Sequence, residues 1–566
     1  MKNYRLNEFK ESLISIVGKS KLLTDIRQTS FYSKGIRVGG GNCFAVAFPT
    51  NLLQLWRLLE ISIIYKKIII IQAANTGLTG GSTPDGEDYD RDILIINTLH
   101  INKLILLNSG KEVLAFPGAS LYQLEDKLSS VGRSPHSVIG SSCIGASVVG
   151  GVCNNSGGNL VNRGPSFTEA SLFAQVTKEG NLELINHLDI DLGNSPEEIF
   201  ENLELLNSNS DKINNSKKML SDKEYVDRVR DVNADTPARF NSDKRRLFES
   251  SGCAGKLAVF AVRMDTFPLP EKEQVFFVGT NNPDNISFLR EKILTRFKYL
   301  PDMGEYMHSS YFDAADKYCK DTFLFIKFFG TAFIPTLLFI KRKFDQLADL
   351  LPFCPNNFSD KLLQYISRLL PDHLPFRIRK FRSKFEHFLI LLTNEMSIVS
   401  TEELLIEAKS KFREIDYIKC SKSEGNDVLL HRYVCGGAPN RYQIVRETNK
   451  SQILPLDIAM PRNLKSWHQI LPPEILSQMD ESFIMAHFLC MVFHWDFIVK
   501  KGVDVNALKK SILSFLDSIG AKYPAEHNVG HLYSAESSLK QFYMKLDPTN
   551  TFNSGIGRTS KNKFYT

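Results

Sequence analysis

The sequence has no pair of cysteines with the C-x-x-C spacing, although nine cysteines occur among its 566 residues. Scattered thiols argue against a disulfide framework or a zinc ribbon, and they are typical of a reducing compartment. Residues 1–8 carry charges without a hydrophobic run, so we expect no secretory signal and a cytoplasmic location. The net charge of +6 is too mild to indicate a partner by itself.

The length exceeds that of a single hydrophobic core, so at least two domains are expected. A content of 43% hydrophobic and 23% charged residues is typical of a globular protein. Short β-rich runs alternate with helix-like stretches and glycine-bearing loops, at residues 45–48, 67–71, 93–96, 113–116 and 257–262. This pattern predicts an α+β nucleotide-binding domain.

Both common phosphate-binding motifs are missing from the glycine-rich loop at 73–82, which follows an isoleucine-rich strand. The loop has neither the Lys-Ser/Thr ending of a nucleoside-triphosphate loop nor the G-x-G-x-x-G fingerprint. Its glycines can still turn successive N–H groups toward one anion. A second run of small residues lies at 140–158. Together the runs predict two walls of one elongated site, whereas either alone is also compatible with a surface loop.

These segments resemble the FAD-binding domain of the vanillyl-alcohol oxidase type. Within that superfamily the chain resembles, nearly from end to end, the membrane-associated, quinone-dependent D-lactate dehydrogenases of bacteria. The resemblance implies FAD bound without a covalent link, because the loop at 72–86 contains no histidine to tether it. The residues that match the family's FAD-binding positions are Ala73, Ala74, Asn75, Thr76, Gly77, Gly81, Ser82, Gly140, Ser147, Gly157 and Val259.

The same resemblance divides the chain into five segments. These are an FAD-binding domain (1–265), the first part of a cap domain (266–320), a membrane-binding segment (321–384), the second part of the cap (385–516) and a C-terminal return to the FAD-binding domain (517–566). A polar stretch at 203–235 predicts a surface insertion. In the cap, we expect a strand around 442–447 and a helix at 504–518.

A long apolar run at 322–340 is interrupted by Lys327 and Pro335, which disfavours a bilayer-spanning helix and favours a segment lying on the membrane. Between Lys361 and Lys384 there are seven basic residues against one acid, interleaved with aromatic residues. This predicts contact with an anionic membrane surface. A solvated basic face over a helical core is the alternative. Binding of nucleic acid is disfavoured, because the remainder of the chain resembles a flavoprotein.

Only 12 histidines occur, yet four of them fall between residues 487 and 531. The FAD-dependent 2-hydroxyacid dehydrogenases carry H-x6-H and then Glu-His-Gly, which hold a metal and supply a base. The resemblance therefore implies a divalent metal at His487, His494 and Glu526, and a catalytic base at His527. The bulky apolar run at 488–493 departs from the family's Gly-Asp-Gly-Asn. A metal-free polar site and a purely structural role therefore both stay open.

The function implied by the resemblance is oxidation of D-lactate to pyruvate by hydride transfer to FAD. Electrons would then pass to a membrane quinone at the cytoplasmic face of the bacterial inner membrane. An arginine should hold the substrate carboxylate, and Arg37, Arg163 and Arg432 are the candidates. The alternatives are another 2-hydroxy acid such as glycolate or 2-hydroxyglutarate, oxygen as the acceptor, or a flavin-free membrane-surface adaptor.

Overall fold

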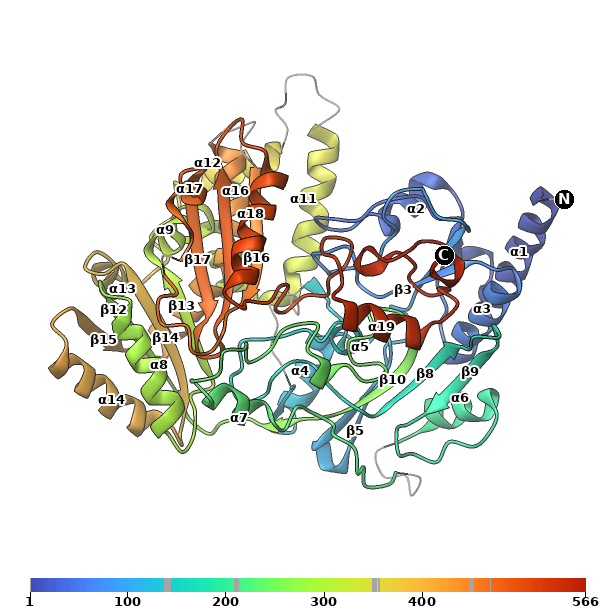
Figure 1. Cartoon of the computed structure of the whole chain (residues 1–566), viewed down its shortest axis with the longest axis horizontal. Helices are drawn as coiled ribbons and strands as arrows, with labels where there is room; N and C mark the ends of the chain where they lie inside the picture. The colour runs from blue at the N-terminus through green and yellow to red at the C-terminus, as the bar shows by residue number, and fades with distance from the viewer. Residues whose placement is uncertain are drawn as a thin grey trace.

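The computed structural model describes residues 2–136, 144–207, 213–348, 354, 357–446, 452–468 and 470–566. Figure 1 shows two parts: the N-terminal half carries two smaller sheets, and the middle of the chain forms a larger one. Helices and sheets are combined in both parts, so the predicted α+β class is confirmed.

The first sheet has the strand order β1-β2-β4-β3, and its last three strands are parallel. The strands are β1 (Leu22–Leu23), β2 (Ala45–Ala47), β3 (Ile68–Gln72) and β4 (Ile93–Asn97). One face is covered by α1 (Lys2–Val17) and α3 (Leu52–Ile64). Because parallel strands are buried on both faces, β3 and β4 are nearly continuous apolar runs. The glycine-rich loop begins at the carboxyl end of β3, where open parallel sheets bind ligands.

The second sheet is antiparallel with the order β5-β6-β10-β8-β9. Its strands are β5 (Leu104–Leu107), β6 (Glu112–Ala115), β8 (Ser171–Val176), β9 (Leu182–Asn186) and β10 (Ala258–Asp265). A short ribbon pairs β7 (Arg133–Ser134) with β11 (Phe267–Pro268). The helices of this part are α2 (Ile26–Ser33), α4 (Leu121–Ser129), α5 (Val148–Cys153), α6 (Pro196–Leu205) and α7 (Tyr225–Arg230). All five β-rich runs expected from the sequence are therefore strands.

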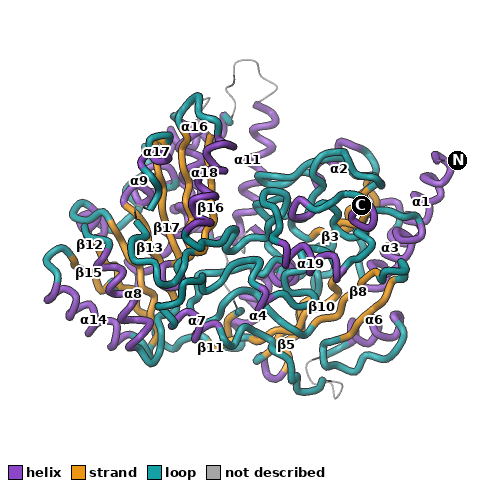
Figure 2. The backbone as a smooth tube through the Cα atoms, viewed as in Figure 1, coloured by secondary structure: helices purple, strands orange, loops and turns teal. Residues whose placement is uncertain are grey.

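The third sheet has seven antiparallel strands in the order β15-β12-β14-β13-β17-β18-β16. They are β12 (Glu273–Thr280), β13 (Met303–His308), β14 (His387–Asn394), β15 (Ile415–Lys419), β16 (Gln452–Ala459), β17 (Met479–His487) and β18 (Val492–Val499). Both faces of this sheet are buried under helices, as Figure 2 shows for the left part of the molecule.

Different helices cover the two faces. The first face packs against α8 (Asp284–Arg296), α14 (Ile398–Lys411), α17 (Pro473–Leu476) and α18 (Val505–Ser518). The second face packs against α9 (Ser309–Tyr318), α10 (Lys320–Phe329), α13 (Phe376–Arg382), α15 (Lys422–Val434) and α16 (Ala438–Val445). Since α18 begins after its N-cap Asp504, the helix expected at 504–518 is confirmed.

The strand expected around 442–447 is wrong, because residues up to 445 belong to helix α16. Tyr442, Ile444 and Val445 are residue types that are common in strands. The helix is favoured by Pro439 in its first turn and by Ala438 and Tyr442, which lie four residues apart and are buried on one side.

The surface insertion expected at 203–235 is also wrong for its second half. Tyr225 and Val229 of α7 are fully buried and join the core on the first face of the seven-stranded sheet. Their spacing of four residues gives one apolar helix stripe, which the polar composition of the whole stretch hides. Residues 208–212 of this stretch lie outside the described residues.

The long apolar run at 322–340 is divided between α10 and α11 (Ile334–Ala348). The break is at Gly330, whose φ of 76° is accessible to glycine, and not at Pro335. Pro335 occupies the first turn of α11, where a missing N–H costs no helical hydrogen bond. Within the described residues, no helix combines the length and apolar character needed to cross a bilayer. Helix α12 (Phe358–Ser367) packs against both α10 and α11.

Candidate functional site

A β-hairpin brings two of the predicted site histidines together. His487 is the last residue of β17, and His494 lies on the adjacent β18. The pairing register places them diagonally on the second face of the sheet, with ring centroids 5.0 Å apart. The apolar residues 488–493 form the hairpin turn and its first strand residues, and they are buried. The departure from the family pattern therefore does not separate the two histidines.

Glu526 completes this group. One of its carboxylate oxygens, Oε2, lies 3.4 Å from His487 Nε2 and 3.5 Å from His494 Nε2. One ligand atom from each of the three residues lies within 4.8 Å of the others. Two imidazole nitrogens and one carboxylate oxygen are a donor set that a divalent ion such as Zn²⁺ accepts. The residues present therefore fit a metal, and we name His487, His494 and Glu526 the first cluster.

Charged side chains surround the first cluster. His487 Nδ1 lies 2.7 Å from Glu305 of β13, and Glu305 pairs at 2.6 Å with Arg432 of α15. On the other side, the guanidinium of Arg239 pairs with Glu526 and donates to the carbonyl of Gly158. These ion pairs are buried, so each charge depends on its partner.

The surroundings act oppositely on the two imidazoles. Burial alone would lower the pKa of His487, but the Glu305 and Glu526 carboxylates outweigh it and raise that pKa to about 10. Burial dominates at His494 and lowers its pKa to about 4. At Glu526, burial favours the neutral acid, but His487 and Arg239 hold its pKa well below the usual range. One histidine is thus held charged and the other neutral.

Asp457 of β16 positions the segment that carries Glu526 and His527. Its Oδ2 accepts hydrogen bonds from the backbone N–H of Glu526 at 2.8 Å and of His527 at 3.3 Å. The His527 ring keeps 38% of its side-chain surface exposed, compared with 13% for His487 and 18% for His494. His527 is therefore the most accessible of the three imidazoles to a small substrate.

The glycine-rich loop after β3 keeps its main chain available for a ligand. The backbone N–H groups from Ala74 to Ser82 donate to no acceptor among the described residues. Asn75 adopts a left-handed conformation, and its side chain bonds to the Lys34 carbonyl and to the Ser82 hydroxyl. These side chains hold the loop, and its half-buried N–H groups form a cradle that fits a pyrophosphate.

The second run of small residues lies between this loop and the first cluster. A Cβ added at Gly145 would lie 3.7 Å from the Ala74 side chain. The Ser147 hydroxyl caps α5 by accepting from the Gly150 N–H at 3.0 Å. A Cβ at Gly157 would overlap the Arg239 guanidinium and lie 2.9 Å from Glu526. Gly140 lies outside the described residues.

Two predicted FAD-binding positions are restricted in how they could contact a ligand. Val259 of β10 is buried, and it pairs with Phe173 of β8. Ala73 accepts a hydrogen bond on its carbonyl from Asn97 at 3.0 Å. Any contact of Val259 with FAD must therefore be made largely by the backbone, and the Ala73 carbonyl is already engaged.

Residues 526–531 join the two halves of the site. Glu526 belongs to the first cluster, and a Cβ at Gly81 would lie 3.8 Å from the Asn528 side chain. The N–H of His531 donates to the Thr79 carbonyl at 2.8 Å. Further on, Asn553 donates to the carbonyls of Gly81 and Ala254. The C-terminal segment therefore contacts both the glycine loop and the histidines.

The three candidate arginines have different surroundings. Arg163 donates to the Pro135 carbonyl and lies over the Phe267 ring, and Arg432 is committed to Glu305. Arg37 is exposed on a loop that packs against the glycine-rich loop. Burial raises the pKa of Asp496 on β18, and the nearby Arg37 charge opposes that rise.

Sequence reasoning missed Glu305, Asp457 and Arg239. Glu305 and Asp457 are single carboxylates inside otherwise apolar strands. A buried carboxylate requires a partner, so this pattern could have indicated a polar site. Arg239 carries no such signal, because it belongs to an irregular segment whose packing the local sequence does not define.

The whole chain is similar to known proteins. A family model described as "D-lactate dehydrogenase, membrane binding" matches residues 275–565. The quinone-dependent D-lactate dehydrogenase of Escherichia coli is 51% identical over 555 residues, covering 98% of this chain and 97% of the relative. The Haemophilus influenzae protein of the same name is 47% identical, covering 98% of each chain. A solved p-cresol methylhydroxylase shares the fold, with a TM-score of 0.59, 12% identity and coverage of 98% of this chain and 97% of that one.

Proposed function

The chain belongs to the family of quinone-dependent D-lactate dehydrogenases, and we propose that it oxidises D-lactate to pyruvate and delivers the electrons through FAD to a membrane quinone. The observation that carries this proposal is the similarity over nearly the full length of both chains. The clustering of the predicted histidines beside the glycine loop supports it.

FAD is proposed to bind noncovalently along the two runs of small residues. When bound, it accepts the hydride from the substrate. The free N–H groups between Ala74 and Ser82 would receive the pyrophosphate. Gly140, Ser147, Gly157 and Val259 belong to the same proposal as further FAD contacts.

His527 is proposed as the general base. Oxidation of D-lactate removes a hydride from C2 and a proton from the C2 hydroxyl, and a histidine with an exposed ring suits the proton transfer. Asp457 holds the His527 backbone and thereby positions the ring.

Arg37 is proposed to bind the substrate carboxylate, because it is the accessible one of the three candidate arginines. A divalent ion held by His487, His494 and Glu526 would polarise the substrate oxygens.

The segment 321–384 is proposed to bind the membrane, on the cytoplasmic face. Its exposed apolar side chains are Phe328, Phe329, Phe333, Ile340, Phe344, Leu347, Leu362, Tyr365, Ile366, Leu369 and Phe376. The basic excess is smaller than the sequence indicates, because Arg377, Arg379 and Arg382 pair with acids. Within the described residues, Arg368, Lys380 and Lys384 have no ion pair, and these support the proposed preference for anionic lipid.

The test of the reaction is anaerobic mixing of the purified protein with D-lactate, L-lactate or glycolate while the absorbance of oxidised flavin is followed. Rapid bleaching by D-lactate alone is expected. Faster bleaching by glycolate would assign a different 2-hydroxy acid to the same site, and a colourless protein that cannot be reconstituted with FAD would overturn the proposal.

The test of membrane binding is co-sedimentation with vesicles of phosphatidylglycerol or of phosphatidylcholine. Changing Phe328 and Phe329, which are 74% and 60% exposed, to Ser should weaken binding to both, since burying a Phe contributes about 1.5–3 kcal/mol. Phe564→Ser, at an exposed position near the C-terminus, is the matched control. Equal affinity of the unaltered protein for the two lipids would remove the anionic preference and leave the apolar attachment.

A further inference from the structure

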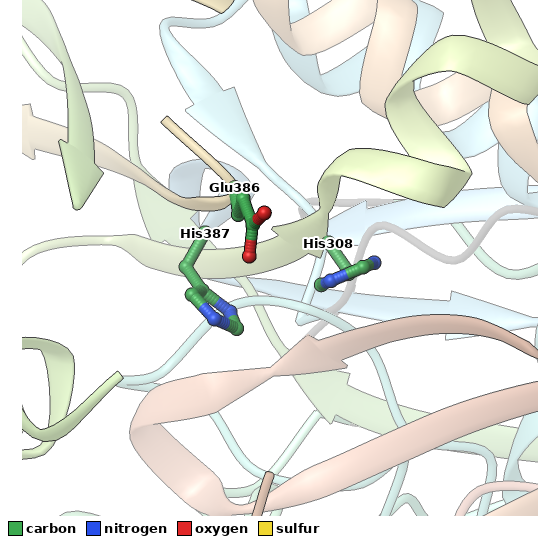
Figure 3. Close-up of side chains that lie close together, drawn as sticks. All are labelled: His308, Glu386 and His387. Atoms are coloured by element: carbon green, nitrogen blue, oxygen red, sulfur yellow. The ribbon is translucent and has the colours of Figure 1, made fainter. Parts of the chain in front are cut away.

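A second group of two histidines and one glutamate lies elsewhere on the seven-stranded sheet. His308 ends β13 and His387 begins β14, and the two residues are direct partners in the antiparallel register. Their ring centroids are 5.3 Å apart. Figure 3 shows the Glu386 carboxylate directed toward the space between the two rings. One ligand atom from each of the three residues lies within 4.8 Å of the others.

Each imidazole of this group is held through one ring nitrogen. His387 Nδ1 lies 2.8 Å from the hydroxyl of the fully buried Tyr306. His308 Nδ1 lies 2.8 Å from the hydroxyl of Ser310, which itself donates to the Ser482 carbonyl. A metal-binding histidine usually donates its other ring N–H to such a partner, which fixes the ring and leaves Nε2 for the ion.

The tautomer of His308 has two alternatives. The Ser310 backbone N–H lies 3.1 Å from Nδ1 and favours a proton on Nε2, whereas a proton on Nδ1 can be donated to the Ser310 hydroxyl. Coordination through Nε2 selects the second form. The second form leaves the Ser310 backbone N–H without the acceptor that caps α9, a cost that the bond from Nε2 to the ion must outweigh.

The group is separate from the first cluster. Successive residues of a strand point to opposite faces, so Glu305 meets His487 on the second face while Tyr306 meets His387 on the first. The nearby cation Arg382 is already paired with Asp313 at 2.5 Å. Glu386 is exposed, which gives an ion an entry path from solvent.

We propose that His308, Glu386 and His387 bind one Zn²⁺ ion, in a site with no part in D-lactate oxidation. Two imidazole nitrogens and one carboxylate leave a fourth position of a tetrahedral zinc for water or another protein ligand. Buried Nδ1 of His468 has no hydrogen-bond partner in the described part of the chain, and His468 is close enough for its charge to act on His387. The ion would tie β13 to the segment that leads from α13 into β14.

The test measures bound zinc per flavin by mass spectrometry after equilibrium dialysis of the full-length holoenzyme against buffered Zn²⁺. The double variant His308→Asn/His387→Asn should lose one equivalent of zinc. Its rate of flavin reduction by D-lactate should stay within about twofold of the unaltered protein. The double variant His487→Asn/His494→Asn reports on the first cluster independently, so failure at one cluster is distinguishable from failure at the other.

Glu386→Gln is a second test variant. Glu386 is exposed, so this substitution should not disturb folding. It should weaken zinc binding at least tenfold. The matched control is His187→Asn, which removes a histidine from an isolated pair with Glu249 and should change nothing. Unchanged zinc stoichiometry and affinity in both the His308→Asn/His387→Asn and Glu386→Gln variants would overturn the proposal.

Discussion

Two clusters with the same side chains lie on opposite faces of one sheet, and they differ in what surrounds them. The first, His487, His494 and Glu526, is enclosed by Glu305, Asp457, Arg239 and Arg432. The second, His308, Glu386 and His387, has the neutral hydroxyls of a tyrosine and a serine as ring partners. The pKa of His487 is raised to about 10, whereas burial lowers that of His387 to about 4.

The donor set alone therefore does not define the chemistry of such a site. In the first cluster, a metal ion must displace the proton of His487, and the Glu305 carboxylate can then accept a hydrogen bond from its Nδ1. In the second, both rings are available as neutral ligands. The charged surroundings of the first cluster suit a site that responds to a substrate. The neutral surroundings of the second suit a structural metal ion that links two strands.

The largest expected effect is on the rate of flavin reduction, when the proposed general base His527 is removed. His527→Ala should lower the rate of flavin reduction by D-lactate about 10²- to 10⁴-fold, because the hydroxyl proton loses its acceptor. The flavin absorbance of the purified protein should be retained. Stopped-flow absorbance measures both, with His387→Ala as the control on the opposite face. A full rate in His527→Ala would move the base to His494, which is neutral at pH 7.

A second contrast compares the two glutamates. Glu526→Gln leaves the buried Arg239 charge without its carboxylate and removes one of the two carboxylates at His487, which should cost about 3–5 kcal/mol in the free energy of unfolding. Glu386→Gln, at an exposed position, should cost less than about 1 kcal/mol in the metal-free protein. Urea unfolding in EDTA measures both. Equal losses would show that the charged surroundings of the first cluster do not matter.

A third contrast uses glycine. Gly157→Ala should displace the Arg239–Glu526 pair and cost about 1–3 kcal/mol in stability, because the new methyl group has no space. The control is Gly436→Ala, where an added Cβ meets nothing within 4 Å. Thermal unfolding and the KM for D-lactate measure the result. If the two variants had the same unfolding temperature and the same KM for D-lactate, Gly157 would not be part of the site.

The smallest effect per pH unit or per substitution is expected for the pH dependence of stability in EDTA, which is spread over several pH units. His487 has its pKa raised above 6.5, so its contribution is complete below about pH 6.5 and is lost as the pH rises toward 10. His387 has its pKa lowered, so its contribution is complete above pH 6.5 and is lost as the pH falls toward 4. Each slope is at most about 1.4 kcal/mol per pH unit. His487→Gln should flatten the alkaline side only, and His387→Gln the acid side only, in urea titrations across this range.

Local pattern was sufficient for much of the fold. The continuous isoleucine run of β3 and the amphipathic helix capped by Asp504 are strong local signals, and both are confirmed. The error at α16 arose because a short run with aromatic and β-branched residues fits either structure, and burial of Ala438 and Tyr442 against distant strands decided between them. Tyr225 and Val229 were missed for the same reason, since their partners are strands of the large sheet.

For the site, the sequence indicated His487, His494, Glu526 and His527 through a motif, and the structure brings the first three together. It did not indicate Arg239, whose contact with Glu526 joins residues 287 positions apart. The second cluster was missed as well. His308 and His387 become neighbours only through strand pairing, and no short motif records a pairing between β13 and β14.

The contacts of residues 526–553 with the loop after β3 have a consequence for biosynthesis. His531 and Thr83 are 448 positions apart, and Asn553 and Gly81 are 472 apart. Contacts of such separation are among the slowest to form, because closing so long a loop loses conformational entropy before the contact compensates for it. A ribosome that has translated the glycine loop must add hundreds of residues before the loop acquires these partners. Nascent chains shorter than 526 residues therefore lack Glu526, the proposed base His527 and the closing contacts together, so the proposed site can be completed only late in synthesis.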